Sequence, residues 1–566
     1  MKKLGKFKYS GKPKYEVNKL KDKTEMLHER NISKFGFDFH PQVSLISAFF
    51  IIVFIGFTIQ NPTGTNAVLN TLRAKVTGNW NWFFIISANL FVLFPLYLIF
   101  SKLGEVRLGG PEAKPEFTNF AWYSMLISAG MGIGLMFWSV GEPLYHMESK
   151  LPFTSNTGNI GEALGITFYH WGFHPWGMYA LVGLALAFFA YNRGLPLSLR
   201  SVFYPIFKDK VFGWVGDIID ILAVIACLFG LATSLGLGSQ QINSGLNYLF
   251  DVPISTNVQV IIIIAITAIA TLSVMSGIGK GVRILSELNM KIAGVFLILI
   301  LILGPSLFIL RAFNNGVGFY LNNLIKISFF TEYGNEWQGS WTIFYWAWWI
   351  SWSPFVGMFI ARVSKGRTVR EFVTAIFVVP TLLSFVWMST FGATAIFQNI
   401  AGEGALLGEV NKNISTSLFA MLQGLDISDL FKTILSLMAT FLVVSFFVTS
   451  SDSGSLVVDS LTSGGKLDSP VPQRIFWAIM EGAVAVALLL AGGADALNAL
   501  QTGVILSGLP FTFILLMMIY SLHVGLKKDF QKLKDYREHK LANTLFNEKI
   551  RGDFEEDESI KARLTK

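Results

Sequence analysis

The sequence contains few charged residues and a single cysteine. Of its 566 residues, 14% are Asp, Glu, Lys or Arg, whereas soluble domains average about a quarter. With 52% hydrophobic residues and a mean hydropathy of +0.52, this scarcity indicates a protein that folds in lipid. The lone Cys227 excludes an internal disulfide and says little about the redox compartment.

Several motifs are also missing. Residues 1–34 are polar and hold eleven Lys/Arg and four Asp/Glu. They lack the early apolar core of a cleavable signal peptide, so none is predicted. No G-x-S-x-G nucleophile motif is present. His170 and His174 have the spacing of a zinc pair, but they lack the adjacent glutamate of a zinc protease and any Cys/His cluster elsewhere. We therefore expect neither an enzyme nor a metal cofactor.

Long apolar runs are abundant. A membrane-spanning helix needs about 20 mostly apolar residues, and twelve stretches meet that length approximately. They are 42–60, 82–100, 120–146, 163–191, 217–250, 257–276, 289–312, 341–363, 370–397, 429–449, 473–492 and 502–523. A membrane β-barrel would show roughly ten-residue alternating segments instead.

Basic residues predict the orientation of these spans. Lys and Arg gather in alternate loops, for example Arg193, Arg200, Lys208 and Lys210 after the fourth stretch. Such loops face the cytoplasm, which predicts cytoplasmic locations for both the N-terminal tail (1–41) and the C-terminal tail (526–566). The net charge of +8 then reflects topology rather than nucleic-acid binding. We expect a disordered N-terminal arm against anionic lipid and a charged C-terminal helix.

Two spans carry potential breaks near their middles. The third contains Gly130-Met131-Gly132-Ile133-Gly134, and the eighth contains Pro354 and Gly357. Interrupted helices at matching positions of two halves indicate the substrate site of a transporter. Because these two stand five spans apart, spans 3–7 and 8–12 would form inverted halves. Close helix packing explains the glycines of the third span equally well.

The eighth span is rich in tryptophan. Trp348, Trp349 and Trp352 share a helix face at mid-span, whereas an interfacial aromatic belt lies at helix ends. Aromatic faces bind quaternary ammonium cations, which is the ligand class that we expect here. In the fourth span, Trp171 could approach Trp176 and Tyr179 if Pro175 bends the helix, although ordinary aromatic packing remains an alternative.

Polar residues within the spans allow further interpretations. Thr449-Ser450-Ser451-Asp452-Ser453 ends the tenth stretch and offers oxygen ligands for a hard cation such as Na⁺, or simply a capped helix end. Glu142, Asp217, Asp220 and Lys291 lie near enough to span ends for snorkelling or capping, with a proton relay as the alternative.

At these residues the sequence resembles the betaine–choline–carnitine transporter family. The segment Trp341–Arg362 is similar to the signature segment of that family, and the likeness covers roughly residues 40–525. The resemblance implies an all-α integral membrane fold with twelve transmembrane helices. Within them, a LeuT-like inverted repeat of two five-helix halves (about 120–312 and 341–523) follows two extra helices. It also implies a homotrimer.

The resemblance further implies two sets of site residues. The substrate site comprises an aromatic box of Trp171, Trp176, Tyr179 and Trp349, with Trp348 and Trp352 along the same route, and Met131, Gly132 and Gly134 at the broken helix. The sodium site comprises the backbone of Ser128, Met131 and Phe446 and the hydroxyls of Thr449 and Ser450.

Two positions bear on specificity and coupling. Choline-transporting members have an acidic residue where this chain has Gly134, and a glycine suits a zwitterion whose own carboxylate a protein carboxylate would repel. At the second sodium site of sodium-coupled members, this chain departs from the pattern with Cys227 and Leu231, which are poor ligands for a hard cation. Thr233 and Ser234 lie nearby and could substitute.

These observations predict a secondary active transporter of the cell membrane. We expect import of glycine betaine, or a related zwitterionic osmolyte, by Na⁺ symport for osmoprotection. Choline, carnitine or ectoine are alternative substrates, and proton coupling or exchange is an alternative mechanism. A ligand-binding membrane sensor or channel is the alternative class, which a polar-lined pore would favour.

Overall fold

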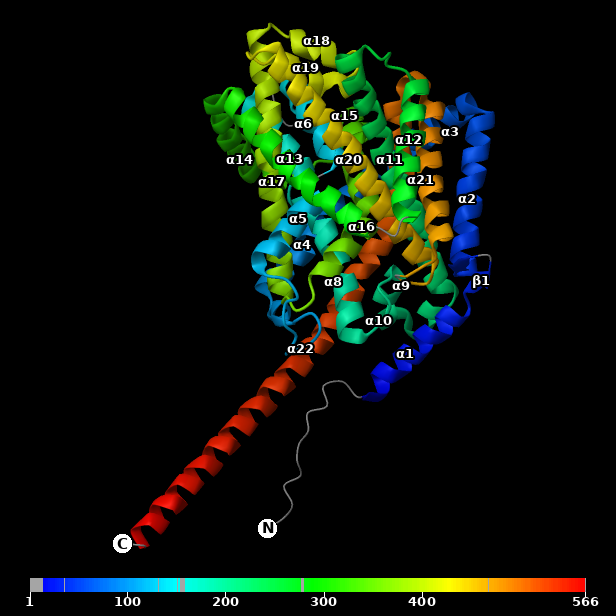
Figure 1. Cartoon of the computed structure of the whole chain (residues 1–566). Helices are drawn as coiled ribbons and strands as arrows, with labels where there is room; N and C mark the ends of the chain where they lie inside the picture. The colour runs from blue at the N-terminus through cyan, green and yellow to red at the C-terminus, as the bar shows by residue number, and fades with distance from the viewer. Residues whose placement is uncertain are drawn as a thin grey trace.

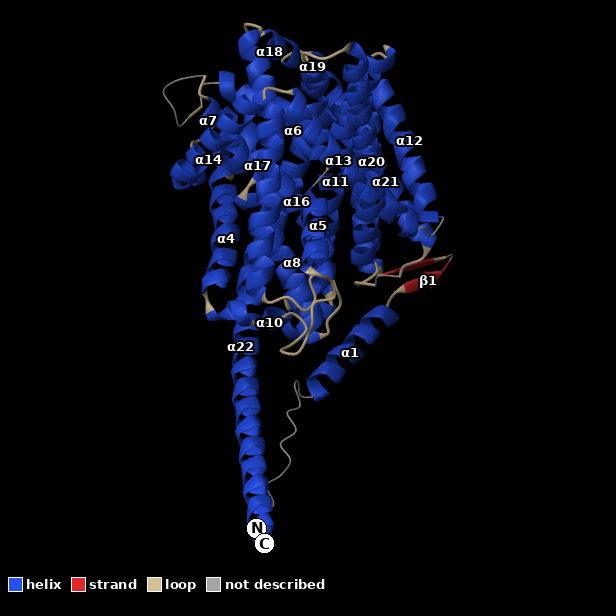
Figure 2. Cartoon of the chain, turned by 60° about the vertical axis from the view of Figure 1, so that its left-hand side comes forward, coloured by secondary structure: helices blue, strands red, loops and turns tan. Residues whose placement is uncertain are grey.

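The computed structural model describes residues 14–564 except 35, 131, 150, 153–157, 276–278 and 467. Within these residues, long helices form one bundle, with the short helices α18 and α19 at one end and α1, α9 and α10 at the other (Figure 1). The described strands form one antiparallel hairpin beside the bundle, in which β1 (Ile32–Lys34) pairs with β2 (Phe37–Phe39) (Figure 2).

The helices have the following bounds: α1 Lys14–Glu29, α2 Pro41–Gln60, α3 Pro62–Asn79, α4 Asn81–Phe100, α5 Asn119–Gly130, α6 Ile133–Glu148, α7 Ile160–Trp171, α8 Phe173–Arg193, α9 Leu199–Val202, α10 Tyr204–Phe207 and α11 Trp214–Phe250. They continue with α12 Thr256–Met275, α13 Gly279–Leu303, α14 Ser306–Ser328, α15 Glu336–Gln338, α16 Phe344–Val363, α17 Val369–Ala401, α18 Ala405–Val410, α19 Ser417–Gln423, α20 Asp429–Thr462, α21 Val471–Gly492 and α22 Ala496–Leu564.

By length and composition, nine helical stretches of the described chain could each cross a membrane, or ten if α5 and α6 form one bent span. Two features separate this number from the twelve predicted spans. The helix α16 falls short in hydropathy because it is rich in tryptophan. The residues Val471–Lys540 form one apolar stretch, although they comprise two helices, α21 and the first part of α22.

The helices α21 and α22 form a hairpin. A Cβ atom on Gly492 would lie 2.9 Å from the Cβ of Ala499, and one on Gly503 would lie 3.2 Å from a methyl group of Leu488. Residue numbers that rise on one helix therefore meet numbers that fall on the other, so the two helices run antiparallel. The turn is made at Gly493, whose φ of 53° lies in the left-handed region that glycine adopts without strain.

One predicted span ends earlier than expected. The stretch 289–312 was predicted as continuous, but α13 ends at Leu303 and α14 begins at Ser306. Pro305 separates them because proline has no backbone N–H and cannot continue a helix. The prediction is therefore wrong beyond Leu303.

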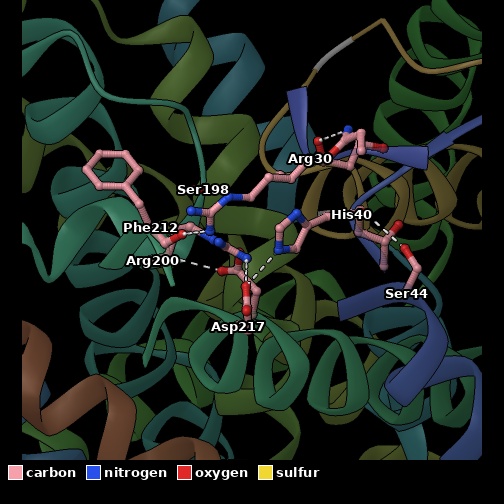
Figure 3. Close-up of polar contacts among 12 residues, drawn as sticks. Arg30, His40, Ser44, Ser198, Arg200, Phe212 and Asp217 are labelled. Atoms are coloured by element: carbon pink, nitrogen blue, oxygen red, sulfur yellow. Dashed lines mark hydrogen bonds and ion pairs between the residues drawn. The ribbon is translucent and has the colours of Figure 1, made fainter. Parts of the chain in front are cut away.

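A buried ionic cluster closes the end of the bundle near α1 (Figure 3). Arg200 in α9 contacts Asp217 (Nη2–Oδ1, 3.0 Å) and Asp220 (Nε–Oδ2, 2.5 Å), both in α11. His40, which precedes α2, lies 2.9 Å from the same Asp217 oxygen. Snorkelling is thus the wrong interpretation for Asp217 and Asp220, because both carboxylates are buried in ion pairs. Asp220 also caps α9, because it accepts from the Arg200 amide (3.1 Å).

Both terminal segments leave the bundle at this same end (Figures 1 and 2). A disordered N-terminal arm is wrong for the described residues, because α1 and the hairpin are ordered and docked. Lys466 contacts Asp38 (Nζ–Oδ2, 2.5 Å), and the Asp38 amide donates to Gln473. The C-terminal helix is confirmed: α22 extends to Leu564, and its Arg537 contacts Glu105.

Candidate substrate site

A small cavity lies within the bundle where α5, α6, α7, α8, α11, α16 and α17 meet. Its lining contains every described residue of the predicted substrate site: Gly132, Gly134, Trp171, Trp176, Tyr179, Trp348, Trp349 and Trp352. Met131, also predicted there, lies outside the described residues. The cavity volume is about 40 Å³, and one water needs about 10–15 Å³. It therefore has room for a headgroup the size of a few waters.

One wall of the cavity is the break between α5 and α6. The two helix axes meet at 62°, and Gly132 is extended (φ −173°, ψ −171°) as the N-cap of α6. Ile133, Gly134 and Leu135, which begin α6, all line the cavity. Their N–H groups have no carbonyl acceptor within the helix. This helix N-terminus therefore favours a negatively charged group.

The opposite walls are aromatic. Trp171 meets Trp349 edge to face, with ring centroids 4.9 Å apart, and Tyr179 meets Trp349 in the same manner at 6.3 Å. Trp176 in turn lies 5.4 Å from Tyr179. Aromatic rings at roughly right angles to one another therefore line the cavity, and aromatic rings bind alkylammonium cations.

Polar contacts fix the indoles of the box. The Nε1 atom of Trp349 donates to the carbonyl of His170 (3.0 Å), and that of Trp348 donates to the hydroxyl of Ser234 (3.2 Å). Trp352 donates to the carbonyl of Gly230 (2.9 Å). Because each N–H group already has an acceptor in the protein, the ring faces and edges are what the ligand would meet.

The fourth predicted span breaks at Gly172, not at Pro175. The helix α7 ends at Trp171 and α8 begins at Phe173, with Gly172 between them (φ −99°, ψ −125°). A Cβ at this position would lie 2.6 Å from the Phe168 carbonyl oxygen. Pro175 occupies the first turn of α8, where proline is tolerated. The break still brings Trp171 to the same cavity as Trp176 and Tyr179, but the predicted cause is wrong.

The eighth span is not interrupted. The helix α16 continues through Pro354 and Gly357 to Val363, so the prediction of two matching broken helices is wrong for this half. The hydroxyl of Ser353 donates to the Ile350 carbonyl (2.7 Å), the acceptor that loses its usual partner at Pro354. Gly357 instead allows close packing, because its Cβ would lie 3.1 Å from the Gly183 nitrogen.

Two glycines of the broken helix admit the indoles. A Cβ on Gly130 would lie 2.7 Å from Trp176, and one on Gly134 would lie 2.9 Å from Trp348 and 3.0 Å from Trp171. Gly132 differs, because nothing lies within 4 Å of the place its Cβ would take. Gly130 and Gly134 therefore serve ring packing, whereas the backbone at Gly132 borders open space.

The predicted sodium residues that the structure describes, which leaves out Met131, lie on two helices. Ser128 is in α5, while Phe446, Thr449 and Ser450 are in α20. The Thr449 hydroxyl is within hydrogen-bond distance of the Ser445 and Phe446 carbonyls, at 3.0 and 3.2 Å. Coordination of Na⁺ by this set stays a prediction.

The residues near the second sodium position are already engaged. Cys227 and Leu231 are buried in the apolar core. The Thr233 hydroxyl donates to the carbonyls of Phe229 and Leu500, and the Ser234 hydroxyl accepts from Trp348. A hydroxyl that donates to a carbonyl keeps lone pairs for a cation, so a substitute role for Thr233 and Ser234 in a second cation site stays a prediction.

Glu142 belongs to a buried network rather than to a span end. Its carboxylate contacts Trp171, Tyr345, His146 and His170, so snorkelling is wrong for this residue. Ligand atoms of Glu142, His146 and His170 lie within 4.8 Å of one another, close enough for a metal ion. His174, which stands at zinc-pair spacing from His170, lies 3.0 Å from Asn89 (Nε2–Oδ1).

Other residues escaped the sequence analysis. Ser384 of α17 lines the cavity, but no spacing within one helix indicates it. Glu481 of α21 is fully buried, and neither of its carboxylate oxygens has a hydrogen-bond partner among the described residues. For Glu481, the sequence does contain a signal of a functional residue, namely a carboxylate inside an otherwise apolar run.

Comparison with known proteins adds to this geometry. Residues 42–531 match the family model described as betaine/carnitine/choline family transporter. The chain is 49% identical over 508 residues to Glycine betaine transporter 1 of Vibrio parahaemolyticus, covering 88% of this chain and 96% of that protein. It is 48% identical to a glycine betaine/proline/choline/ectoine transporter of the same organism, covering 88% and 89%. It is 42% identical to the glycine betaine transporter OpuD of Bacillus subtilis, covering 84% and 92%.

Proposed function

The chain belongs to the betaine/carnitine/choline transporter family, and we propose that it imports glycine betaine, or a related zwitterionic osmolyte, by Na⁺ symport for osmoprotection. It is a transporter of the multi-pass membrane class and not an enzyme. Na⁺ is the coupling ion rather than a bound cofactor.

The proposal rests on two kinds of binding group that line one cavity: aromatic rings and the N-terminus of a helix. The aromatic box of Trp171, Trp176, Tyr179 and Trp349 suits a trimethylammonium group, which cannot donate hydrogen bonds. The N-terminus of α6 suits a carboxylate. Glycine betaine carries these two groups one methylene apart, and the aromatic box and the helix N-terminus line the same cavity. Choline lacks the carboxylate and would leave the helix N-terminus without a partner.

We also propose the twelve-span architecture. Counting α16 as a span, and α21 and α22 as two, supports twelve spans when α5/α6 and α7/α8 each count once. An even number of spans fits the exit of both tails at one end (Figure 1), which we assign to the cytoplasm from the basic loops. A LeuT-like inverted repeat, a homotrimeric assembly and contact with anionic lipid remain part of the proposal.

The test is uptake into proteoliposomes. Labelled betaine, choline, carnitine and ectoine are supplied with an inward sodium gradient, with potassium in its place, and with a proton gradient alone. We expect betaine uptake to be the fastest and to require sodium. Equal betaine uptake in potassium with a proton gradient would overturn sodium coupling, and absence of betaine uptake under all conditions would overturn the substrate.

Replacing Thr449 by alanine tests the sodium site. Loss of one oxygen ligand should weaken Na⁺ binding, so the sodium concentration for half-maximal uptake should rise several-fold while the maximal rate at saturating sodium changes less. Thr440→Ala is the matched control, because that buried hydroxyl in the same helix also bonds a carbonyl one turn back, in Ser436. An equal sodium dependence in both variants would remove Thr449 from the site.

Substrate breadth is the main alternative within this class. The relative from Vibrio parahaemolyticus named as a glycine betaine/proline/choline/ectoine transporter is 48% identical to this chain, so similarity at this level accompanies both narrow and broad names. Competition of each unlabelled compound against labelled betaine in the same vesicles distinguishes the two. A broad transporter would show comparable inhibition constants for choline and betaine.

A further inference from the structure

Glu142 stands directly behind the aromatic box. It is fully buried in α6, about two turns after Gly134, and does not line the cavity. Its Oε2 atom accepts hydrogen bonds from Nε1 of Trp171 (2.8 Å) and from the hydroxyl of Tyr345 (2.5 Å). Its Oε1 atom lies 2.7 Å from Nδ1 of His170 and 3.4 Å from Nε2 of His146.

This environment suits a negative charge. The indole N–H can only donate, and an ionised carboxylate can only accept, so the contacts of Oε2 match that form. Among the described residues, no lysine or arginine forms an ion pair with Glu142, whose basic neighbours are two histidines that carry charge only when protonated. A charge buried in the membrane interior is costly and indicates a functional role.

Both donors to Oε2 contact the centre of the box. Trp171 meets Trp349 edge to face at 4.9 Å, and Tyr345 stacks on Trp349 at 5.8 Å with an interplanar angle of 20°. The carboxylate therefore fixes the orientation of rings on two sides of Trp349. An N–H group bonded to a negative oxygen also pushes electron density toward the indole ring.

We propose that Glu142 is the buried counter-charge of the aromatic box and determines its preference for a cationic headgroup. It acts through Trp171, and partly through Tyr345, and is thus a positioning residue that does not touch the substrate. The inference rests on the proposed function, because it assigns a charge partner to the trimethylammonium group at the same site.

The same side chains could instead hold a metal ion, since Glu142, His146 and His170 meet the distance requirement. The hydrogen bonds that these side chains make favour the role of counter-charge over that of metal ligand. Both ring nitrogens of His170 are engaged, with Glu142 (2.7 Å) and with the Thr342 hydroxyl (3.0 Å). Two of the donors around the carboxylate, Trp171 and Tyr345, are not metal-ligand types that zinc prefers.

The test compares two ligands that differ only in charge at the headgroup. Betaine and its carbon isostere 3,3-dimethylbutanoate share shape and carboxylate, but the isostere is neutral where betaine is cationic. Affinities of purified wild type and Glu142→Gln are measured for both. We expect the variant to lose betaine affinity by about tenfold and to keep its affinity for the isostere within about twofold. Equal losses for both ligands would mean a structural role and would overturn the inference.

Glu148→Gln is the matched control, because Glu148 is an exposed residue of the same helix and should leave both affinities unchanged. A double-mutant cycle with Trp171→Phe, which removes the indole donor and keeps an aromatic ring, uses betaine alone. We expect Glu142→Gln to cost much less in the Trp171→Phe background. Strictly additive losses would overturn the inference.

Three further outcomes are distinguishable. Loss of betaine affinity in the wild type on adding a chelator, restored by Zn²⁺, would replace the counter-charge by a metal site. Failure of the wild type to bind betaine would refute the proposed function itself, whereas normal betaine binding by both wild type and Glu142→Gln would refute the counter-charge alone.

Discussion

Replacing Trp349 by leucine should raise the betaine concentration for half-maximal uptake by about 5- to 30-fold, equivalent to about 1–2 kcal/mol. The indole lies at the centre of the box, stacked on Trp348 at 4.9 Å and edge to face with Trp171. Leucine preserves much of the apolar contact but has no π face to attract the cation. The measurement is the concentration dependence of labelled betaine uptake at saturating sodium.

Two variants separate this attraction from packing. Trp349→Phe keeps a weaker aromatic face and loses the bond to the His170 carbonyl, so its affinity should fall between wild type and leucine. Trp346→Phe is the control, since Trp346 is buried in the same helix but stacks on His174 outside the cavity. Unchanged half-saturation in Trp349→Leu, or an equal loss in Trp346→Phe, would remove Trp349 from the site.

The box was predictable because its signals are local or carried by resemblance. Residues three or four apart share a helix face, so the spacing of Trp348, Trp349 and Trp352 is enough to place them together. Long apolar runs likewise predicted the membrane helices, as α2, α4, α11, α12 and α17 illustrate. Each of these predictions requires the residues of one helix only.

The errors arise where one residue type has two structural outcomes. Pro354 was expected to break the eighth span, but Ser353 satisfies the carbonyl that proline leaves free, and the helix continues. Pro175 was expected to bend the fourth, but it sits in a first helical turn and Gly172 makes the break. Whether a proline interrupts a helix depends on its position in the helix and on neighbouring acceptors, which a hydropathy pattern does not contain.

The network of Glu142 could not be predicted for a different reason. Its partners His170 and Tyr345 stand 28 and 203 positions away along the chain and come from α7 and α16. Only tertiary packing brings these helices together. In the sequence, a carboxylate near a span end resembles a snorkelling residue, and nothing local distinguishes the two cases.

Gly134 combines a steric and an electrostatic effect, and variants can separate them. The family resemblance implies that its missing side chain keeps a protein carboxylate away from a zwitterionic substrate. The structure adds a steric requirement, because any Cβ would lie 2.9 Å from Trp348 and 3.0 Å from Trp171. Indole rings held by hydrogen bonds do not yield easily, and overpacking costs about 1–3 kcal/mol.

Gly134→Ala should therefore weaken uptake of betaine and choline alike, by roughly tenfold or more, through displacement of the two indoles. Gly134→Asp should carry the same steric cost, and its carboxylate should additionally attract the choline cation and repel the betaine carboxylate. The informative quantity is the ratio of choline to betaine affinity, which alanine should leave near the wild-type value and aspartate should raise. Gly56→Ala is the control, because its Cβ would meet no atom within 4 Å and α2 does not line the cavity. If Gly134→Asp left the ratio of choline to betaine affinity unchanged, only the steric effect would remain. Position 134 would then not select between a zwitterion and a cation.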